Sequence, residues 1–475
     1  MEIPKKKIID RSLRQLHKTW LDIGQTARNR LTGNIRPHLP PEDFEWIRRQ
    51  VNSCLSDTGG AASARARAAN LGGVYLGLNK EGRKVFLRLL GDEYGVDIDL
   101  LEDAVRKWLR LAKNSERVMV DGRPDLLAEE KLRATLVSPR IRLLTRFNAL
   151  HEGVKFLVDM RAELITIKDQ NLQLEAFDRE FRDLLASWFD VGFLDLRRIT
   201  WDAPAVLIEE LARHEAVHAI RSWQDIKHRL AAGDRCCYAF IHPQMPNDPL
   251  IFVWIALTDG LPHKIQDLLK LGEGEVEAAK ADTAVFYSIS ATQPGLDGVG
   301  FGSFLIKQVV DQLSQNNENL RSFVTLSPIP GFRAWLQENL KNFRLGSGTL
   351  EILAPLLSKI SPEEEKRIFL DRSWIQDGIN KYDLRDTILA LATHYLINEK
   401  SGIAALDRVA NFHLSNGASM ERLNWMGDVS RKGQRESACL MINYRYQSKD
   451  IESNHERYHI LGKISYSKNI ATLLP

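Results

Sequence analysis

Residues 284–336 read AVFYSISATQPGLDGVGFGSFLIKQVVDQLSQNNENLRSFVTLSPIPGFRAWL, and this stretch decides the fold of the second half of the chain. A β-branched and aromatic run (284–291) leads into a glycine-rich loop, an amphipathic helix that begins near Phe301, and a second strand that ends at Ser327. Glycines let the backbone approach an anion closely, and the N–H groups at the start of the helix add donors and a positive dipole end. The stretch predicts a phosphate cradle beside a reactive hydroxyl.

The loop supplies the candidate binding residues, which are Gln293, Gly295, Asp297, Gly298, Val299, Gly300, Phe301, Gly302 and Ser303. Its spacing fits neither G-x-x-x-x-G-K-[ST] nor G-x-G-x-x-G. From Gln293 to Gly298 it is similar to the Gln/Arg-x-x-Gly-x-Gly/Ala loop with which GNAT-type acyl-CoA enzymes hold the diphosphate of coenzyme A. The alternative is a turn between strand and helix that needs glycines for geometry alone.

Composition and charge limit the classes of partner. At 475 residues the chain has room for two or three domains, and its formal net charge of +3 is too small to recruit nucleic acid. The four cysteines form no C-x-x-C pair, which predicts buried thiols in a reducing compartment. With neither a secretion signal nor an apolar stretch of bilayer length, we expect a cytoplasmic protein with no membrane partner.

The first 190 residues read as successive helices. Apolar side chains recur at helical spacing, for example Leu100, Ala104, Trp108 and Leu111. The expected helices begin at Pro41 and cover about 80–90, 99–114, 125–136, 139–152 and 174–189. We interpret residues 1–190 as a helical packing or oligomerisation domain rather than a ligand-binding one.

Residues 191–475 alternate strands and helices. A helix is expected at 205–215, a mostly helical insertion at about 332–400, and strands at 235–242, 250–258, 284–291, 321–327 and 437–446. The run LIFVWIALT (250–258) is continuously apolar, which is typical of a strand covered on both faces. The fold class is therefore α+β, with an all-α domain followed by a mixed α/β domain.

The segment His214-Glu215-Ala216-Val217-His218 satisfies H-E-x-x-H, which on a helix places two histidines on one face for zinc with a glutamate as base. The extended pattern needs Gly at 221 and His at 224, where this chain has Arg221 and Gln224. No third ligand is evident, so a surface or substrate-facing helix end is favoured over a metal site.

Three further residues are candidates for chemistry. Ser327 ends a strand and is followed by prolines that hold it at the strand tip, although a structural turn serine is the alternative. His413 is predicted to lie in a loop of small polar residues, where a histidine is suited to proton transfer or is simply structural. Tyr444 and Tyr446 end the last strand on one face, either packing there or lending a hydroxyl to the same pocket.

Four blocks of the second half occur in the order FYSISATQPGLDGVGFGSFLIKQVV, LSPIPGFRAWL, VANFHLSNGASMERLNWMGDVS and MINYRY. Together they resemble the malonyl-CoA decarboxylase family, and the upstream ITW and EAVH segments extend the likeness to about Phe193. The resemblance implies a GNAT-like catalytic domain in which Ser327 and His413 match the catalytic serine and histidine. Tyr446 then matches a tyrosine near the acyl group, and residues 297–303 match the substrate loop, where animal relatives carry Glu in place of Gly300.

The resemblance implies decarboxylation of malonyl-CoA to acetyl-CoA and CO₂ without a metal or organic cofactor, by a homo-oligomer (dimer or tetramer). Ser327 is expected to fix the malonyl group, and His413 to protonate the enolate. The role in the cell, either malonate breakdown or fatty acid metabolism, stays open. The alternatives are a GNAT-like acyltransferase, which needs an acceptor pocket, and an acyl-CoA sensor that releases no CO₂.

Overall fold

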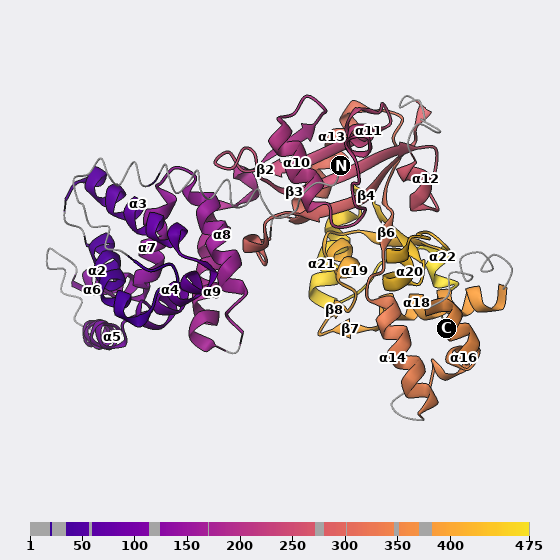
Figure 1. The fold of residues 1–475 in the computed structure, drawn as a ribbon. Coiled ribbons are helices and arrows are strands. Elements are labelled where there is room, and N and C mark those ends of the chain that lie inside the picture. The colour runs from indigo at the N-terminus through magenta and orange to yellow at the C-terminus, as the bar shows by residue number, and fades with distance from the viewer. Residues whose placement is uncertain are drawn as a thin grey trace.

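The computed structural model describes Trp20 and residues 35–56, 59–113, 124–169, 171–270, 280–300, 302–345, 351–369 and 382–474. Figure 1 shows the N-terminal helices gathered in one body beside a sheet, with further helices at the far end of the chain. An all-α region followed by a mixed α/β region confirms the predicted fold class.

The N-terminal body consists of packed helices. They are α2 (Phe44–Leu55), α3 (Ala61–Gly77), α4 (Lys80–Glu93), α5 (Ile98–Lys113), α6 (Pro124–Leu136), α7 (Pro139–Asn148), α8 (Gly153–Ile165) and α9 (Leu172–Trp188). The side chains of Asn79 and Asn171 accept hydrogen bonds from the first free N–H groups of α4 and α9, which is the usual role of asparagine at a helix start. Buried aromatic rings, including Phe86, Phe147 and Phe156, fill the core.

Two helices of this body were not predicted from the sequence. α3 is rich in alanine and glycine, which leaves little apolar pattern to read. α8 buries residues on most of its circumference, so it lacks the polar face that makes helical periodicity visible. Both helices pack against α7.

The second region is organised around a mixed sheet whose strand order is β1-β2-β3-β4-β5-β10-β6, with β9 also paired to β10. The strands are β1 (Asp195–Ile199), β2 (Arg235–Ile241), β3 (Pro249–Thr258), β4 (Thr283–Ala291), β5 (Ser322–Thr325), β6 (Ser327–Pro328), β9 (Ser419–Asn424) and β10 (Met441–Tyr446). Among the paired strands of the described residues, only β4 and β5 run parallel, and α13 (Gly302–Asn316) is the crossover between them.

Both faces of the sheet are covered. α10 (Ala205–His214), α11 (Trp223–Ala231) and α12 (Ile265–Leu269) pack on one face, and α13 packs on the other. β3 is buried along its length up to Leu257, which confirms the prediction of a doubly covered strand. The four cysteines are buried thiols that form no disulfide.

The C-terminal part adds helices below the sheet in Figure 1. They are α14 (Phe332–Arg344), α15 (Ala354–Leu357), α16 (Pro362–Phe369), α18 (Tyr382–Asn398), α19 (Arg408–Ser415), α20 (Arg431–Ser437), α21 (Ile451–Leu461) and α22 (Lys468–Ala471); a short hairpin of β7 (Lys400–Ser401) and β8 (Ala404–Ala405) precedes α19. In the described part of the chain, no helix has the length and apolar character to cross a membrane.

One strand boundary and one type of element differ from those expected. The last strand was predicted from Ser437, but α20 ends there and a left-handed turn at Ala438 (φ +48°) and Cys439 (φ +64°) precedes β10. The prediction of a loop around His413 is wrong, because this residue lies on α19. Asp407 caps that helix, since its carboxylate accepts from the N–H groups of Val409 (3.0 Å) and Ala410 (2.9 Å).

Candidate active site

Ser327, His413 and Tyr446 lie side by side in the structure, although they come from β6, α19 and β10. Ser327 Oγ is 3.0 Å from His413 Nε2, and the hydroxyl of Tyr446 is 2.8 Å from His413 Nδ1. Both nitrogens of the imidazole are therefore engaged. Tyr446 is the group that orients the histidine, a role the sequence had left without a residue.

Strand β10 holds the two sides of this site together. Its Ile442 pairs with Ser327, and its Tyr446 pairs with Phe323 of β5. The side chain of Thr325, the last residue of β5, accepts from Ser327 Oγ (2.9 Å) and from the backbone N–H of Tyr444 (3.1 Å). These bonds fix the serine hydroxyl against the strand that carries Tyr446.

The imidazole of His413 is held in an apolar, desolvated position. The ring of Tyr444 stacks on it, with centroids 4.6 Å apart and an interplanar angle of 27°. Burial lowers the pKa of His413 to about 3 and raises the pKa of Tyr446. The pair is therefore neutral at pH 7.

A cavity of about 370 Å³ opens onto Ser327 and His413. Its walls come from β4, α19, α20 and the segment after α10, and its charged lining residues are Arg408, Lys432 and Glu436. Lys432 Nζ donates to the carbonyl oxygens of Ala216 (2.6 Å) and Val217 (3.1 Å), which ties α20 to the segment after α10. The cavity thus has a hydroxyl and an imidazole at one wall and cationic groups at others.

The glycine-rich loop follows β4, whose last residue Ala291 lines the same cavity. Gly298 has φ +76°, a backbone conformation that favours glycine. Gly295 is tightly packed, because a Cβ there would come within 1.8 Å of the Val158 carbonyl on α8. Gly300 is open, with nothing within 4 Å of such a Cβ, so a longer side chain is sterically allowed at this position.

The other predicted loop residues have mixed surroundings. The Gln293 side chain is buried and donates to the Pro249 carbonyl (3.2 Å), a structural contact rather than one aimed at solvent. Val299 is buried. Phe301 and the side chain of Ser303 lie outside the described residues, and for Gly302 only the backbone at the start of α13 is described. Among the loop residues from Gln293 to Gly300, none lines the cavity beside His413.

Arg161 of α8 braces this loop from the helical body. Its Nη1 donates to the carbonyl oxygens of Gly295 and Asp297, both at 2.8 Å, and its Nε donates to Asp178 at 2.9 Å. Lys168 also pairs with Asp178 at 2.6 Å. A contact between residues 134 positions apart carries no sequence signal, so Arg161 was not predicted.

The zinc-helix geometry proposed for His214 to His218 is absent. α10 ends at His214, and Glu215 accepts from the N–H groups of Val217 (2.8 Å) and His218 (2.7 Å) and from Ser288 Oγ. Within the described ranges, no group of three or more His, Cys, Asp or Glu side chains is arranged to hold a metal ion. Glu215 instead shapes a turn beside the cavity.

Comparison with known proteins places the chain in a family. The model of the malonyl-CoA decarboxylase C-terminal domain matches residues 192–475, and that of the N-terminal domain matches residues 94–189. The chain belongs to the malonyl-CoA decarboxylase family. Similar proteins include the mitochondrial malonyl-CoA decarboxylase of Anser anser anser, 35% identical over 86% of this chain and 84% of its own, and that of Rattus norvegicus, 35% identical over 93% and 90%.

Solved structures agree with this assignment. Malonyl-CoA decarboxylase from Rhodopseudomonas palustris superposes with a TM-score of 0.80 and 36% identity, covering 90% of this chain and 99% of the other. The structure from Agrobacterium vitis gives 0.79 and 36% over the same shares. The resemblance inferred from the four sequence blocks is thereby confirmed.

Proposed function

We propose that this chain decarboxylates malonyl-CoA to acetyl-CoA and CO₂. The observation that carries the proposal is the hydrogen-bonded set of Ser327, His413 and Tyr446 on the wall of a cavity, in a chain of this family. The relatives from goose and rat bear the name of this activity. An acyltransferase is not favoured.

The substrate supplies its own electron sink. When the bond between the α-carbon and the carboxylate breaks, CO₂ leaves and the electron pair delocalises into the thioester carbonyl as an enolate. A proton delivered to the α-carbon then completes acetyl-CoA. The protein needs to hold the carboxylate out of the enolate plane, to stabilise the oxyanion and to supply the proton. Each positioned donor to the oxyanion is worth about 3–4 kcal/mol.

Ser327 is the proposed donor to the malonyl group. Its oxygen is already held beside Thr325 and His413, so when substrate arrives only the hydroxyl proton needs to turn from Thr325 Oγ1 toward the malonyl group. Lys432 and Arg408 line the same cavity and attract the malonyl carboxylate. Bound in this way, the carboxylate lies near His413.

The charge of His413 is proposed to follow the reaction. A carboxylate nearby favours the imidazolium, so substrate binding raises the pKa of His413 from the low value that burial alone gives it. Loss of CO₂ removes that carboxylate, and burial then makes the imidazolium a strong acid. Its Nε2 proton passes to the α-carbon while Tyr446 keeps Nδ1 in place.

We further propose that the loop from Gln293 to Ser303 and the start of α13 hold the coenzyme A diphosphate. The loop directly follows β4, which lines the cavity up to Ala291. Its positive-φ glycine and the free N–H groups at the helix start suit an anion. The GNAT-like character of the domain belongs to this same proposal.

The decisive experiment is mass-resolved product analysis after malonyl-CoA alone is added to the protein. Acetyl-CoA and CO₂ are expected without any acceptor, whereas an acyltransferase or a sensor yields neither. His413→Asn is expected to lower turnover about 10²–10⁴-fold while coenzyme A still binds. His459→Asn on α21 is the matched control, because this histidine is exposed. Near-normal CO₂ release from His413→Asn would refute its role, and an unchanged rate in Ser327→Ala at saturating substrate would remove the serine.

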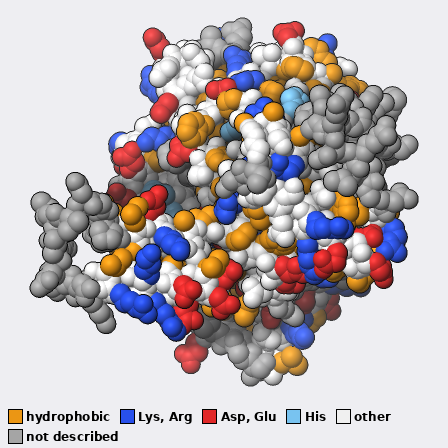
Figure 2. All heavy atoms as spheres, turned by 90° about the vertical axis from the view of Figure 1, so that its left-hand side faces the viewer, with side chains coloured by type: hydrophobic (Ala, Val, Ile, Leu, Met, Phe, Trp, Pro, Cys, Tyr) orange, Lys and Arg blue, Asp and Glu red, His pale blue; other side chains and the backbone are white. Residues whose placement is uncertain are grey.

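We propose that the α5–α6 hairpin is a contact between copies of the chain. The two helices pack mainly on each other and expose apolar side chains, such as Ile98 (68% exposed) and Leu127 (63%). Figure 2 looks onto this helical end and shows apolar side chains among charged ones. Leu127→Glu is expected to reduce the mass measured by light scattering, whereas Leu172→Glu, exposed on α9, is the control.

For location, we propose the cytoplasm. The buried thiols of Cys54, Cys236, Cys237 and Cys439, which form no disulfide, suit a reducing compartment. Fractionation of cells that make the protein tests this proposal, and recovery with an organelle would contradict it. Removal of malonyl-CoA in that location is compatible with a role in either fatty acid metabolism or malonate breakdown.

A further inference from the structure

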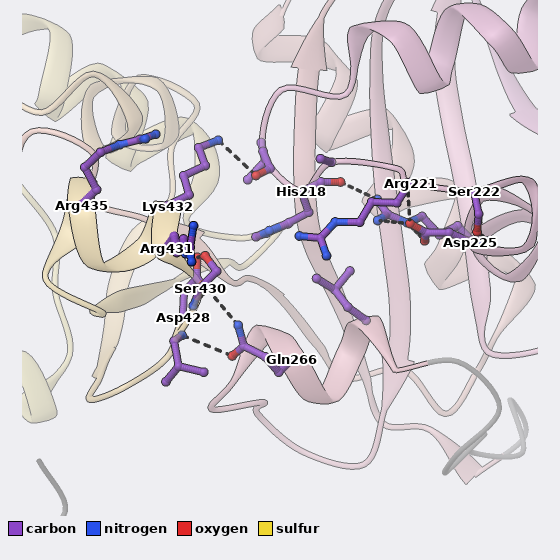
Figure 3. A pocket seen from close by; sticks show the side chains of 15 residues that line it. His218, Arg221, Ser222, Asp225, Gln266, Asp428, Ser430, Arg431, Lys432 and Arg435 are labelled. Carbon is purple, nitrogen blue, oxygen red and sulfur yellow. Dashed lines mark hydrogen bonds and ion pairs between the residues drawn. The ribbon is translucent and has the colours of Figure 1, made fainter. Parts of the chain in front are cut away.

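A second cavity, larger than the first at about 830 Å³, lies beside the active site. Its walls are the segment from Val217 to Arg229, which includes the start of α11, and the segment from Asp428 to Arg435, which includes α20. Figure 3 shows these two walls facing each other across the opening. Val217 and Lys432 line both cavities, so the two spaces adjoin.

The charge of this second cavity is predominantly positive. Its basic lining residues are Arg221, Arg229, Arg431, Lys432 and Arg435, against the two acidic residues Asp225 and Asp428. Both carboxylates are already occupied. Asp225 pairs with Arg229 at 3.0 Å, and Asp428 accepts from Gln266 Nε2 at 2.8 Å and from the backbone of Ser430 at 2.9 Å.

Two guanidinium groups are left over. Across the described ranges of the chain, neither Arg221 nor Arg431 has an ion pair or a side-chain hydrogen bond. In Figure 3 the side chain of Arg221 extends from its wall into the space between the two walls, and Arg431 lies on the opposite wall. A guanidinium presents a planar fork of N–H donors that matches the oxygens of a carboxylate or a phosphate.

His218 is a second and independent sign of a ligand. It is only 8% exposed, its Nε2 atom has no hydrogen-bond partner, and its ring points toward Asp428 and Arg431 in Figure 3. Buried polar atoms in native proteins nearly always have partners. Burial lowers the pKa of His218 to about 4, so the ring is neutral at pH 7, and an anion beside it favours the protonated form in which Nε2 donates a hydrogen bond.

We propose that this cavity is a binding site for a small free oxyanion, a carboxylate or a phosphate, held by Arg221 and Arg431 with His218 completing the contact. The site is separate from the one that takes the thioester. It uses the segment after α10, which contains the EAVH residues that the proposed reaction leaves without a role. The proposal stands on this cavity alone and does not depend on the decarboxylase activity.

The shared residue Lys432 couples the two sites. Its ammonium group donates hydrogen bonds to the carbonyl oxygens of Ala216 and Val217. Because Lys432 lines both cavities, an anion in either one is attracted to the same positive charge. Two anions on opposite sides of one lysine repel each other. Each is therefore expected to weaken the other's binding several-fold, and by linkage the factor is the same in both directions.

The test is calorimetric titration with two probes, sodium malonate and sodium phosphate, at constant ionic strength set with chloride. The wild-type chain is expected to bind one equivalent of at least one probe. The double variant Arg221→Gln/Arg431→Gln is expected to lose affinity about tenfold or more for each missing charged contact. The matched control is Arg88→Gln, because Arg88 is exposed on α4 far along the sequence from either wall. The stronger probe identifies the carboxylate or the phosphate as the ligand class.

Two further arms keep the result decisive. Arg221→Lys/Arg431→Lys keeps the charge but removes the forks, so intermediate affinity supports the proposal. Titration in saturating acetyl-CoA is expected to leave binding in place, weakened at most several-fold. Absence of binding by both probes, equal affinity in the Gln double variant, or loss of all binding with acetyl-CoA would overturn the proposal. Circular dichroism of each variant establishes that it is folded before it is titrated.

Discussion

Replacing His413 should change how the stability of the protein depends on pH, and the size of that change follows from the structure. The imidazole is buried, and its pKa falls to about 3 in the folded chain. In the unfolded chain a histidine has a pKa of about 6.5. Because the folded pKa is the lower one, the unfolded state binds more protons between these values, and stability is lost as pH falls from about 6.5 toward 3.

The expected magnitude can be worked out at a single pH. At pH 8 both states are neutral at this residue, so the linkage contributes almost nothing. At pH 5 the unfolded histidine is protonated while the folded one is not, which costs the folded state about 2 kcal/mol. His413→Asn removes this contribution whatever its effect on stability at pH 8. Between pH 8 and pH 5, the difference in unfolding free energy between variant and wild type should therefore shift by about 2 kcal/mol in favour of the variant.

Denaturant unfolding at a series of pH values between 8 and 5 measures the shift, with His459→Asn as the control. The control removes an exposed histidine from α21 and should run parallel to the wild type. If His413→Asn and the wild type lose stability in parallel, His413 is not held neutral by burial. The proposed acid strength of its imidazolium would then have no basis, because that strength comes from the same desolvation.

Other predictions concern the groups that hold the site. Tyr446→Phe leaves His413 Nδ1 without its 2.8 Å partner, so the turnover measured by steady-state kinetics should fall about 10–100-fold. Coenzyme A binding should change little. An unchanged turnover would contradict the orienting role. Arg161→Gln leaves Asp178 paired with Lys168 alone and frees the glycine loop, so the unfolding free energy should fall by about 1–3 kcal/mol and KM should rise. A KM equal to that of the wild type would contradict a role of this loop in substrate binding. Asp407→Ala removes the cap of α19 and should lower the unfolding free energy by about 1–2 kcal/mol in denaturant titration. Asp407→Asn should lose less, because it retains the cap acceptor and gives up only the longer bonds from Gly331 N–H (3.3 Å) and the Tyr395 hydroxyl (3.5 Å); an equal loss in both variants would contradict the capping role.

The sequence predicted what depends on local patterns. Alternating and continuous apolar runs located β2, β3 and β4 to within about two residues, and the prolines after Ser327 located the strand tip. Helical stripes located α4, α5, α6 and α9. The signal for α19 was also present, since Asp407 is a favoured cap and Asn416-Gly417 a favoured end, but the small polar residues around His413 were given more weight.

Long-range pairings could not be predicted. Arg161 reaches the glycine loop from a helix about 130 residues earlier in the chain, and Lys432 reaches the carbonyls of Ala216 and Val217 across more than 200 residues. Neither contact leaves a pattern in one sequence, because any exposed-looking arginine or lysine is compatible with many partners. For the same reason, the second cavity is invisible until α10, α11 and α20 are placed together.

The site itself depends most on the register of one strand. β10 pairs Ile442 with Ser327 on one side, and on the other side a register shift between Asn443 and Tyr444 changes its pairing with β9. Side chains alternate along a strand, so a slip of one residue would turn Tyr444 and Tyr446 to the opposite face. His413 would then lose its stacked ring and its Nδ1 partner together. The sequence predicts that the two tyrosines share a face, but only the fold determines that this face is the one on which His413 lies.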